Sequence, residues 1–317
     1  MILITGGLGF IGLHTARALL DLGESCVLTR YRVARAPSFL AADLGGRAIV
    51  EQVDITDQQA VLRLGEQHEI TGIVHLAEGG FGAPGLTDDL RLHVETLMNV
   101  LQAAHDWGVP RVAVASTIGV YAGVDEGPFR EDMPLPMTAP HPIVLRKKVS
   151  ELLSSFVAGR GGFEVVNLRI AGVYGPMYHN MSPIAVAARL VHAAVDGRRP
   201  EFTPRFRPYA EDGSDWCYAA DCGRAIALLQ TAATLAHSLY NVGTGHATTN
   251  KEFVAAIKNV IPDADVDLPE GHAPDGPGRA VALDTSRLRD DTGFRPAYDV
   301  ERGVAAYIDW LRSGNAQ

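Results

Sequence analysis

The sequence predicts an α/β fold in which a doubly wound parallel sheet, with helices on both faces, is joined to a smaller C-terminal lobe. Short apolar runs alternate with longer helical patterns over the first 170 residues, which is typical of such a sheet. Prolines at positions 176, 183, 200, 204 and 208 then interrupt the pattern, and the strict alternation of strand and helix ends. We therefore expect a large α/β core and a lobe rich in loops.

The apolar runs predict strands at residues 2–5, 25–29, 48–53, 72–76, 112–116 and 165–170, and the helical patterns predict helices at residues 11–22, 57–68, 88–107 and 143–160. Gly23 follows the first helix, as is typical of a helix end. Thr56 and Gln59 predict a capping box before the second helix. A last, amphipathic helix is expected at residues 300–313, after a loop at residues 263–279 that holds three prolines and three glycines.

The composition excludes several classes of protein. The 317 residues are 47% hydrophobic, enough for a large core, and their formal net charge of −9 argues against nucleic acid or anionic lipid as a partner. No apolar run approaches the roughly 18–20 residues that span a membrane, and the sequence starts without the pattern of a signal peptide. The three cysteines have the spacing of neither a zinc site nor a disulfide framework. We therefore expect a cytoplasmic protein with free thiols and no metal site.

A glycine-rich turn follows the first expected strand. Gly6, Gly9 and Gly12 are spaced by three residues, with Phe10 and Ile11 at the start of the next helix. In a Rossmann-type fold such glycines permit a tight turn, let backbone N–H groups approach a pyrophosphate, and bring the helix close to the strand. The helix N-terminus also attracts phosphate. An ordinary glycine-rich turn is the alternative, but the flanking strand and helix favour a nicotinamide dinucleotide site.

The end of the second strand bears on which dinucleotide binds. A carboxylate there accepts the ribose hydroxyls of NAD, whereas arginine favours the 2′-phosphate of NADP. This strand ends in Arg30 and Arg32 without a carboxylate, which favours NADP over NAD, although a solvated basic loop that also includes Arg35 is the alternative. After the third strand, Asp54 is placed to bond the adenine amino group and Ile55 to pack on its ring. A turn aspartate is the alternative for Asp54.

Further motifs follow in order along the chain. They are Thr5-Gly6-Gly7-Leu8-Gly9-Phe10-Ile11-Gly12, His75-Leu76-Ala77, Ser116-Thr117-Ile118-Gly119-Val120-Tyr121, Leu168-Arg169, Val173-Tyr174-Gly175-Pro176, Asp215-Trp216-Cys217-Tyr218 with Asp221, Tyr240-Asn241-Val242-Gly243-Thr244-Gly245, and Leu283-Asp284-Thr285-Ser286 with Gly293-Phe294-Arg295-Pro296. Over nearly the whole chain they resemble the extended short-chain dehydrogenases/reductases of the nucleotide-sugar epimerase/dehydratase type.

The resemblance implies a catalytic unit made of a Ser or Thr, a Tyr and a Lys. Thr117 matches the hydroxyl residue that positions the substrate oxygen, and Ser116 is the neighbouring candidate. The lysine holds the nicotinamide ribose and lowers the pKa of the tyrosine, which moves the proton. Leu76 and Ala77 match the segment that lines the cofactor near the nicotinamide.

The sequence departs from this pattern at the tyrosine. Glu151 follows Lys147 by four residues, as a glutamate often does in the family, and this register places Ile143 in the tyrosine position. Choosing Lys148 instead places Val144 there. Neither side chain carries a proton, although Lys147 can still bind the ribose. The proton transfer of the family therefore needs a substitute here.

Four residues are candidates for that substitute because motif proximity brings them toward the expected site. His141 lies two residues before the tyrosine position and has a pKa suited to the task. Tyr178 and His179 follow the Gly175-Pro176 turn, and Glu78 stands where the family usually has a small residue. A loop histidine, a tyrosine at the edge of the core and a solvated glutamate are the alternatives.

Two positions that bind substrate in the family also differ. The asparagine that often contacts the substrate diphosphate is Gly172 here, and an arginine before the Asp-Trp-Cys-Tyr motif is Ser214. Both differences weaken the case for a nucleotide-sugar ligand. Arg205 and Arg207 are candidates to compensate because guanidinium groups bind phosphate, and surface charges are the alternative.

The resemblance also implies a domain division and a partner. Residues 1–170 are expected to form the Rossmann dinucleotide-binding domain, and residues 171–317 mainly a substrate-binding lobe, with residues 213–245 returning to the core. A homodimer is expected through the helices at residues 88–107 and 144–160. The apolar faces of these helices consist of Leu90, Val94, Leu97 and Leu101, and of Val149, Leu152, Leu153 and Phe156. The alternative is that these faces cover the sheet and belong to the core.

Two functions fit these observations. The first is an NAD(P)-dependent oxidoreductase, epimerase or dehydratase that acts on a hydroxyl or carbonyl carbon of a sugar-like or other small substrate, with a non-standard acid/base. The second is a dinucleotide-binding sensor or scaffold with little or no catalysis. Ile143 favours the second, whereas Thr117, Lys147 and the glycine turn are compatible with both.

Overall fold

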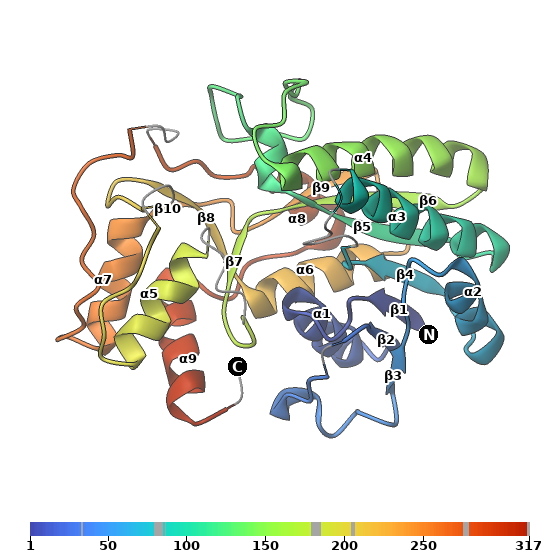
Figure 1. Ribbon diagram of the computed structural model, residues 1–317, viewed down its shortest axis with the longest axis horizontal. Coiled ribbons are helices and arrows are strands. Elements are labelled where there is room, and N and C mark those ends of the chain that lie inside the picture. Colours follow the sequence, from blue (N-terminus) through green and yellow to red (C-terminus); the bar gives the residue numbers. More distant parts are fainter. Residues whose placement is uncertain are drawn as a thin grey trace.

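The computed structural model describes residues 1–32, 34–78, 85, 87–178, 185–203, 207–274 and 279–315. Two of the candidate residues, His179 and Arg205, lie outside these ranges. The described chain forms a large sheet between two layers of helices, with a smaller lobe beside it (Figure 1).

The main sheet is parallel and, within the described residues, has seven strands in the order β3-β2-β1-β4-β5-β6-β9. The strands are β1 (Ile2–Thr5), β2 (Cys26–Arg30), β3 (Ala48–Gln52), β4 (Gly72–His75), β5 (Arg111–Thr117), β6 (Glu164–Ile170) and β9 (Leu239–Val242). All residues of β1 and β4 are buried, as continuous apolar runs predict for strands covered on both faces. The strand order reverses between β1 and β4, and ligands of open parallel sheets bind outside such a point.

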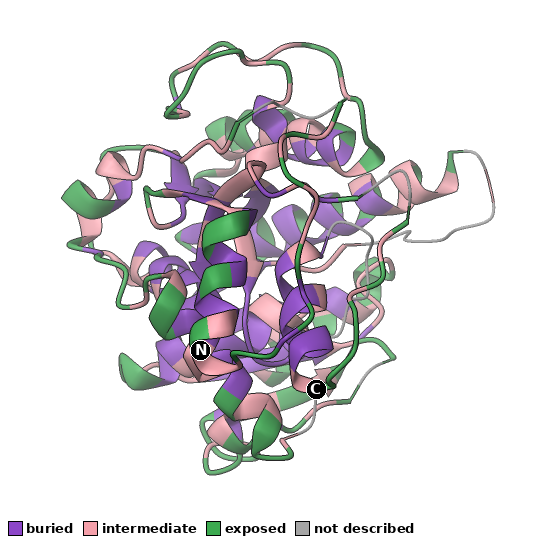
Figure 2. Ribbon diagram, turned by 90° about the vertical axis from the view of Figure 1, so that its left-hand side faces the viewer, coloured by how far each residue is buried: buried purple, intermediate pink, exposed green. Residues whose placement is uncertain are grey.

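Helices cover both faces of the sheet (Figure 1). Helix α1 (Phe10–Asp21) packs against α6 (Ala219–Thr231) on one face, and α2 (Gln58–Gln67), α3 (Asp88–Asp106) and α4 (Pro142–Gly161) cover the other. One apolar cluster lies under each layer. Figure 2 shows buried residues toward the middle of the molecule and exposed residues toward its outside. No helix of the described ranges combines the length and the apolar character needed to cross a bilayer.

Among the residues described, the smaller lobe holds a three-stranded sheet in the order β10-β8-β7. Its strands are β7 (Gly172–Tyr174), β8 (Gly213–Tyr218) and β10 (Ala247–Thr249). Helices α5 (Val186–Val195), α7 (Asn250–Val260) and α9 (Val300–Arg312) pack together around a third apolar cluster, and α8 (Ser286–Thr292) packs against α6 and β9. The predicted fold class, a doubly wound parallel sheet with a smaller C-terminal lobe, is therefore confirmed.

The predicted capping box at Thr56 and Gln59 is wrong. Helix α2 begins after Asp57, whose carboxylate accepts the N–H group of Ala60 over 3.1 Å. Thr56 instead donates its N–H and its hydroxyl to Oδ1 of Asp54, at 3.0 and 2.7 Å. The carboxylate of Asp57 is a stronger acceptor for a helix N-terminus than the threonine hydroxyl.

Candidate functional site

The glycine-rich turn joins β1 to α1 at the strand-order reversal. Gly6 has a φ of 68°, which side chains rarely adopt, and its carbonyl oxygen accepts the N–H group of Gly9 over 2.8 Å. A Cβ atom at Gly12 would lie 2.9 Å from Cα of Gly7 and closer still to the carbonyl oxygen of Gly6. Gly12 therefore lets the helix pack closely against the turn that directly follows β1.

The N-terminus of α1 offers a cradle for phosphate. Its N-cap residue is Gly9, which has no side chain to occupy the helix end, and the first turn contains no acidic residue. A Cβ atom at Gly9 would lie 2.9 Å from the carbonyl oxygen of Gly6, so only glycine leaves this space open. Phe10 and Ile11 are half-buried beside it. A dinucleotide pyrophosphate fits such a helix end.

The end of β2 lies beside the same turn. The hydroxyl of Thr29 accepts the N–H group of Gly6 over 3.1 Å and ties the strand to the turn. Arg30 is half-buried and donates to Oε1 of Gln52 on β3 over 2.9 Å. Arg32 is exposed. Both arginines thus lie at the strand end where the sequence predicted them.

Arg35 lies closer to the turn than the prediction assumed. Its guanidinium donates to the carbonyl oxygen of Leu8, inside the glycine turn, over 3.5 Å. Burial lowers the pKa of Arg35, although the group stays charged near neutral pH. In the sequence, Arg35 enters only through the alternative of a solvated basic loop, and its spacing does not indicate this contact.

The loop after β3 is held by hydrogen bonds of its own. Asp54 accepts from Thr56, as described above, which is the behaviour of a turn aspartate. Asn99 on α3 donates to the carbonyl oxygens of Ile55 and Thr56 over 3.0 and 2.9 Å. Ile55 is half-buried against the apolar cluster below α2 and α3. The adenine contacts expected for Asp54 and Ile55 stay predictions.

The segment after β4 runs along the turn. Leu76 and Ala77 donate their N–H groups to the carbonyl and the hydroxyl oxygen of Thr5, over 3.2 and 3.3 Å. A Cβ atom at Gly6 would lie 3.1 Å from Cα of Ala77, so the two backbones are in close contact. The ring of His75 bonds the hydroxyl of Thr5 over 2.8 Å. Leu76 and Ala77 are therefore placed beside the cradle.

Glu78, the next residue, forms an ion pair with Lys147. Its Oε1 lies 2.5 Å from Nζ of Lys147, and its Oε2 lies 3.7 Å from the guanidinium of Arg146. The two basic side chains are only 9% and 3% exposed. Burial alone would raise the pKa of Glu78, but the two cations outweigh it and hold the pKa below its usual range. The carboxylate is therefore ionised at neutral pH.

The register of α4 follows from its two lysines. Lys148 donates to the carbonyl oxygens of Pro136 and Thr138 and so points away from β4. Lys147 faces β4 and contacts Glu78. Ile143 precedes Lys147 by one helical turn and is half-buried, which leaves the tyrosine position apolar.

The other two described substitutes lie elsewhere. His141 is the exposed N-cap of α4, and its Nδ1 accepts the N–H group of Ile143 over 3.2 Å. The Tyr178 ring meets Phe10 edge-on at 4.7 Å between centroids, and burial raises the pKa of its hydroxyl. Of the three described alternatives, Glu78 is the one that an ion pair joins to Lys147.

Thr117 and Ser116 end β5 with different partners. Thr117 is half-buried, and its hydroxyl accepts the N–H group of Gly119 over 3.2 Å, while no residue in the described ranges accepts its own proton. Ser116 is buried and donates to Oε1 of Glu151 over 2.5 Å. Glu151 also accepts from Arg169 on β6 over 3.0 and 2.8 Å. Ser116 thus belongs to a buried network, and Thr117 is the better-placed hydroxyl.

The substrate positions in the lobe are remodelled. A Cβ atom at Gly172 would lie 2.7 Å from two ring carbons of Trp216, so the indole fills the space of an asparagine side chain. Ser214 is half-buried on β8, and Arg207 is exposed. Gly172 is therefore required by the packing of Trp216.

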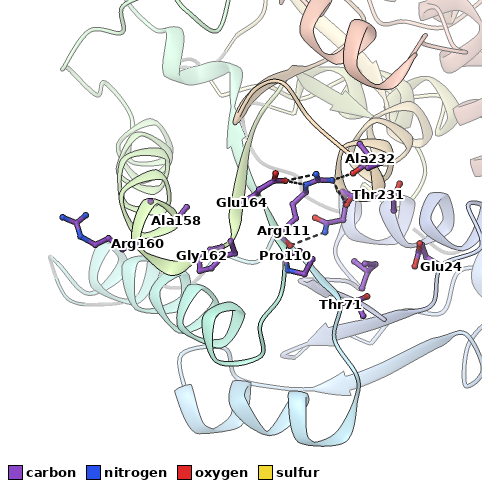
Figure 3. A pocket seen from close by; sticks show the side chains of 15 residues that line it. Glu24, Thr71, Pro110, Arg111, Ala158, Arg160, Gly162, Glu164, Thr231 and Ala232 are labelled. Carbon is purple, nitrogen blue, oxygen red and sulfur yellow. Dashed lines mark hydrogen bonds and ion pairs between the residues drawn. The ribbon is translucent and has the colours of Figure 1, made fainter.

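A cavity of about 790 Å³ lies at the amino ends of the strands, where Ile2, Arg111 and Glu164 begin β1, β5 and β6 (Figure 3). Arg111 pairs with Glu164 over 2.8 Å and donates to the carbonyl oxygens of Leu229 and Gln230 at the end of α6. This arrangement caps the C-terminus of α6. The cavity is remote from the glycine turn, which follows the other end of β1.

Residues 2–243 match the family described as the NAD dependent epimerase/dehydratase family. The chain is 29% identical over 327 residues to dTDP-glucose 4,6-dehydratase of Streptomyces griseus, covering 98% of this chain and 93% of that protein. It is 26% identical over 335 residues to UDP-glucose 4-epimerase 2 of Arabidopsis thaliana, covering 98% and 94%. The structure of the Thermus thermophilus UDP-glucose 4-epimerase complex with NAD has a TM-score of 0.79 at 24% identity, covering 98% of each chain.

Proposed function

The chain belongs to the NAD-dependent epimerase/dehydratase family, and we propose that it oxidises and reduces a hydroxyl-bearing or carbonyl carbon of a nucleotide sugar or similar small substrate, with Glu78 as the group that moves the proton. The ion pair of 2.5 Å between Glu78 and Lys147 is the observation that carries the proposal. This ion pair supports the proposal because the charged carboxylate lies beside Lys147, one helical turn after Ile143, which stands where the family has its tyrosine.

The roles of the residues follow from the balance of the reaction. Oxidation of a carbinol carbon releases one hydride and one proton. A bound nicotinamide supplies the acceptor for the hydride. The carboxylate of Glu78 takes the proton from the substrate hydroxyl and returns it when the carbonyl is reduced, so no net oxidant is needed for a complete cycle. Thr117 positions the substrate oxygen, and Lys147 orients Glu78 and holds the ribose.

His141 and Tyr178 have weaker support as acid–base groups. The ring of His141 serves as a helix cap, and the ring of Tyr178 packs against Phe10 at the cradle. We therefore assign His141 to the helix N-terminus and Tyr178 to the wall between the lobe and the turn.

We propose NADP as the preferred cofactor, with NAD as the alternative. Arg30, Arg32 and Arg35 surround the end of β2, and the strand ends without a carboxylate to accept the ribose hydroxyls. Arg35 has the strongest support because it reaches the glycine turn itself. The related Thermus thermophilus epimerase is in complex with NAD, so the preference needs its own test.

We propose that residues 1–170 bind the dinucleotide, that residues 171–317 mainly bind the substrate, and that residues 213–245 return to the core. Strand β9 and helix α6 support the last part because they belong to the main sheet and its cover. Relatives named for UDP-glucose and dTDP-glucose make these the first substrates to try.

We also propose a homodimer. Leu145, Leu152 and Phe156 form an exposed stripe along α4, at 41%, 67% and 62% exposure, and Met98 on α3 is 38% exposed. Exposed apolar side chains in one stripe favour contact with a second copy of the chain. Leu97 and Leu101, which the sequence also assigned to this face, are instead buried in the core.

The test combines activity with a matched pair of variants. The chain is incubated with NAD or NADP and with UDP-glucose, dTDP-glucose and simpler sugars and ketones, and reduced cofactor and altered sugar are followed by absorbance and NMR. Turnover by the unaltered chain should fall at least about 100-fold in Glu78→Gln and stay unchanged in Glu95→Gln, an exposed glutamate on α3. Full activity of Glu78→Gln would refute Glu78 as the proton-moving group. Tight dinucleotide binding without turnover of any substrate would favour a sensor or scaffold.

A further inference from the structure

In the described part of the chain, the ion pairs around Glu78 balance in charge. Two carboxylates, Glu78 and Asp89, face two buried cations, Arg146 and Lys147, and the Arg146–Asp89 distance is 3.4 Å. Removal of one carboxylate would leave this buried cluster with an excess positive charge. Because Arg146 and Lys147 are largely shielded from water, such a charge would act strongly on nearby groups.

The two histidines beside the cluster do not alter this balance. Burial, and then the Lys147 cation, lower the pKa of His75 to about 3 and that of His93 to about 4. Both rings are therefore neutral near pH 7. His93 bonds the hydroxyl of Ser150 over 2.8 Å, which links α3 to α4 beside the ion pair.

The position of the cluster follows from the topology. A dinucleotide that crosses the β1/β4 reversal places one half over β1, β2 and β3 and the other over β4, β5 and β6. The glycine turn and the arginines after β2 serve the adenosine half. Ala77 touches Gly6, and Glu78 continues from there toward α4. Glu78 therefore lies on the nicotinamide side.

We propose that the Glu78 carboxylate determines which redox form of the cofactor this chain prefers, by attracting the oxidised nicotinamide, which carries a positive charge, over the neutral reduced ring. This inference rests on the proposed function. Without Glu78, Lys147 and Arg146 would repel the oxidised ring. Uptake of a proton by Glu78 would leave the four side chains with a net positive charge, which disfavours the oxidised ring and is compatible with the neutral reduced ring.

The consequence is a resting enzyme that holds the oxidised cofactor. The group that accepts the substrate proton is then charged at the start of the cycle, when it must act as a base. An enzyme that must recover its cofactor within each cycle benefits from this bias, because the reduced form is the weaker-bound one and returns its hydride readily.

The test measures binding, not turnover. Dissociation constants for NAD+, NADH, NADP+ and NADPH are determined by calorimetry for the unaltered chain, Glu78→Gln, Lys147→Met and the control Glu95→Gln. The ratio of oxidised to reduced dissociation constants should rise roughly tenfold in Glu78→Gln, fall in Lys147→Met because a cation is lost, and stay constant in the control. Effects of Lys147 on ribose binding cancel in this ratio.

Three results would be decisive against the inference. A ratio unchanged in Glu78→Gln, or shifts of the same sign in the Glu78 and Lys147 variants, would overturn it while leaving dinucleotide binding intact. Failure of the unaltered chain to bind any of the four dinucleotides would overturn the proposed function as well. Circular dichroism of each variant checks folding, and opposite shifts in two folded variants cannot arise from a general loss of structure.

Discussion

His14 on α1 and Pro176 in the loop after β7 are joined by a hydrogen bond of 2.9 Å, from Nε2 of the imidazole to the carbonyl oxygen. The ring also stacks on Phe39, with 5.2 Å between centroids. Burial lowers the pKa of His14 to about 4, although the bond to Pro176 opposes the shift. The helix that carries the cradle is thus fastened to the lobe by a neutral histidine.

Acid should therefore destabilise the folded protein at a higher pH than that at which its carboxylates take up protons. A histidine has a pKa near 6.5 in the unfolded chain and about 4 here, so the stability that neutral His14 contributes is complete above about pH 6.5 and is lost as the pH falls toward 4. The expected loss is about 1.4 kcal/mol per pH unit in that window. His14→Gln keeps a hydrogen-bond donor for Pro176 but cannot take up a proton. In urea titrations at several pH values, the unfolding free energy of this variant should depend less steeply on pH, by the amount that corresponds to one proton. An unchanged slope would contradict the assignment.

Gly12→Ala should damage both folding and the cradle. Its methyl group would meet the backbone of Gly6 and Gly7, so we expect a loss of about 1–3 kcal/mol in unfolding free energy together with loss of dinucleotide binding. Gly159→Ala in α4 is the matched control, because its Cβ would meet nothing within 4 Å. The control should gain about 0.5–1 kcal/mol from higher helix propensity. Urea denaturation and calorimetry measure both, and equal effects would refute the packing argument.

Arg35→Gln should weaken NADP binding more than Arg30→Gln. Arg35 reaches Leu8 in the glycine turn, whereas Arg30 is already bonded to Gln52. Loss of one guanidinium contact to a phosphate predicts a decrease of roughly tenfold in NADP affinity, with little change for NAD. Thermal shifts with each cofactor provide the measurement. Equal shifts with NADP and NAD in the unaltered chain would remove the preference for NADP.

Leu152→Glu with Phe156→Glu should convert a dimer into a monomer. Both side chains are more than half exposed on α4, and charges there would disfavour burial against a second copy. Sedimentation at micromolar concentrations distinguishes the two states. Leu22→Glu, at an apolar residue 48% exposed beyond the end of α1, should remain dimeric. A monomeric unaltered chain would refute the homodimer.

Ile143→Tyr probes the vacant tyrosine position. The new hydroxyl would lie one helical turn from Lys147, where it can serve as a second proton-moving group. In a Glu78→Ala background, Ile143→Tyr should raise turnover at least about tenfold over Glu78→Ala alone, and Ile143→Phe should leave it unchanged. Equal activity of the two would show that position 143 does not reach the substrate.

The strands and helices of the first half were predictable because each carries its own pattern. Strand β1 was predicted at its observed bounds, and α1 differs by one residue at each end. Local patterns failed where two acceptors compete: Thr56 matched a capping box, but Asp57 is the N-cap. The stronger N-cap preference of aspartate over threonine was the signal that decides between them.

The candidate site was predictable only in part, because its contacts join residues far apart in sequence. Glu78 and Lys147 were each identified, but their ion pair depends on how α4 packs beside β4. Arg146 and Asp89 went unnoticed, since a charged residue on a helix is usually solvated. An arginine next to a site lysine in an apolar stretch was the one available signal. That position 172 has no room for a side chain could not be predicted, because it depends on where the Trp216 ring lies, and no local sequence pattern gives that.

Strand β9 and helix α6 tie the main sheet to the second half of the chain. A fragment that stopped at residue 170 would leave β6 with an unpaired edge and the apolar side of α1 uncovered, two features that promote aggregation. Exchange of the smaller lobe between relatives would therefore have to keep residues 219–242 with the first half. The two parts of the chain should therefore be divided so that β9 and α6 stay with the main sheet, and not near residue 170, where the sequence pattern changes.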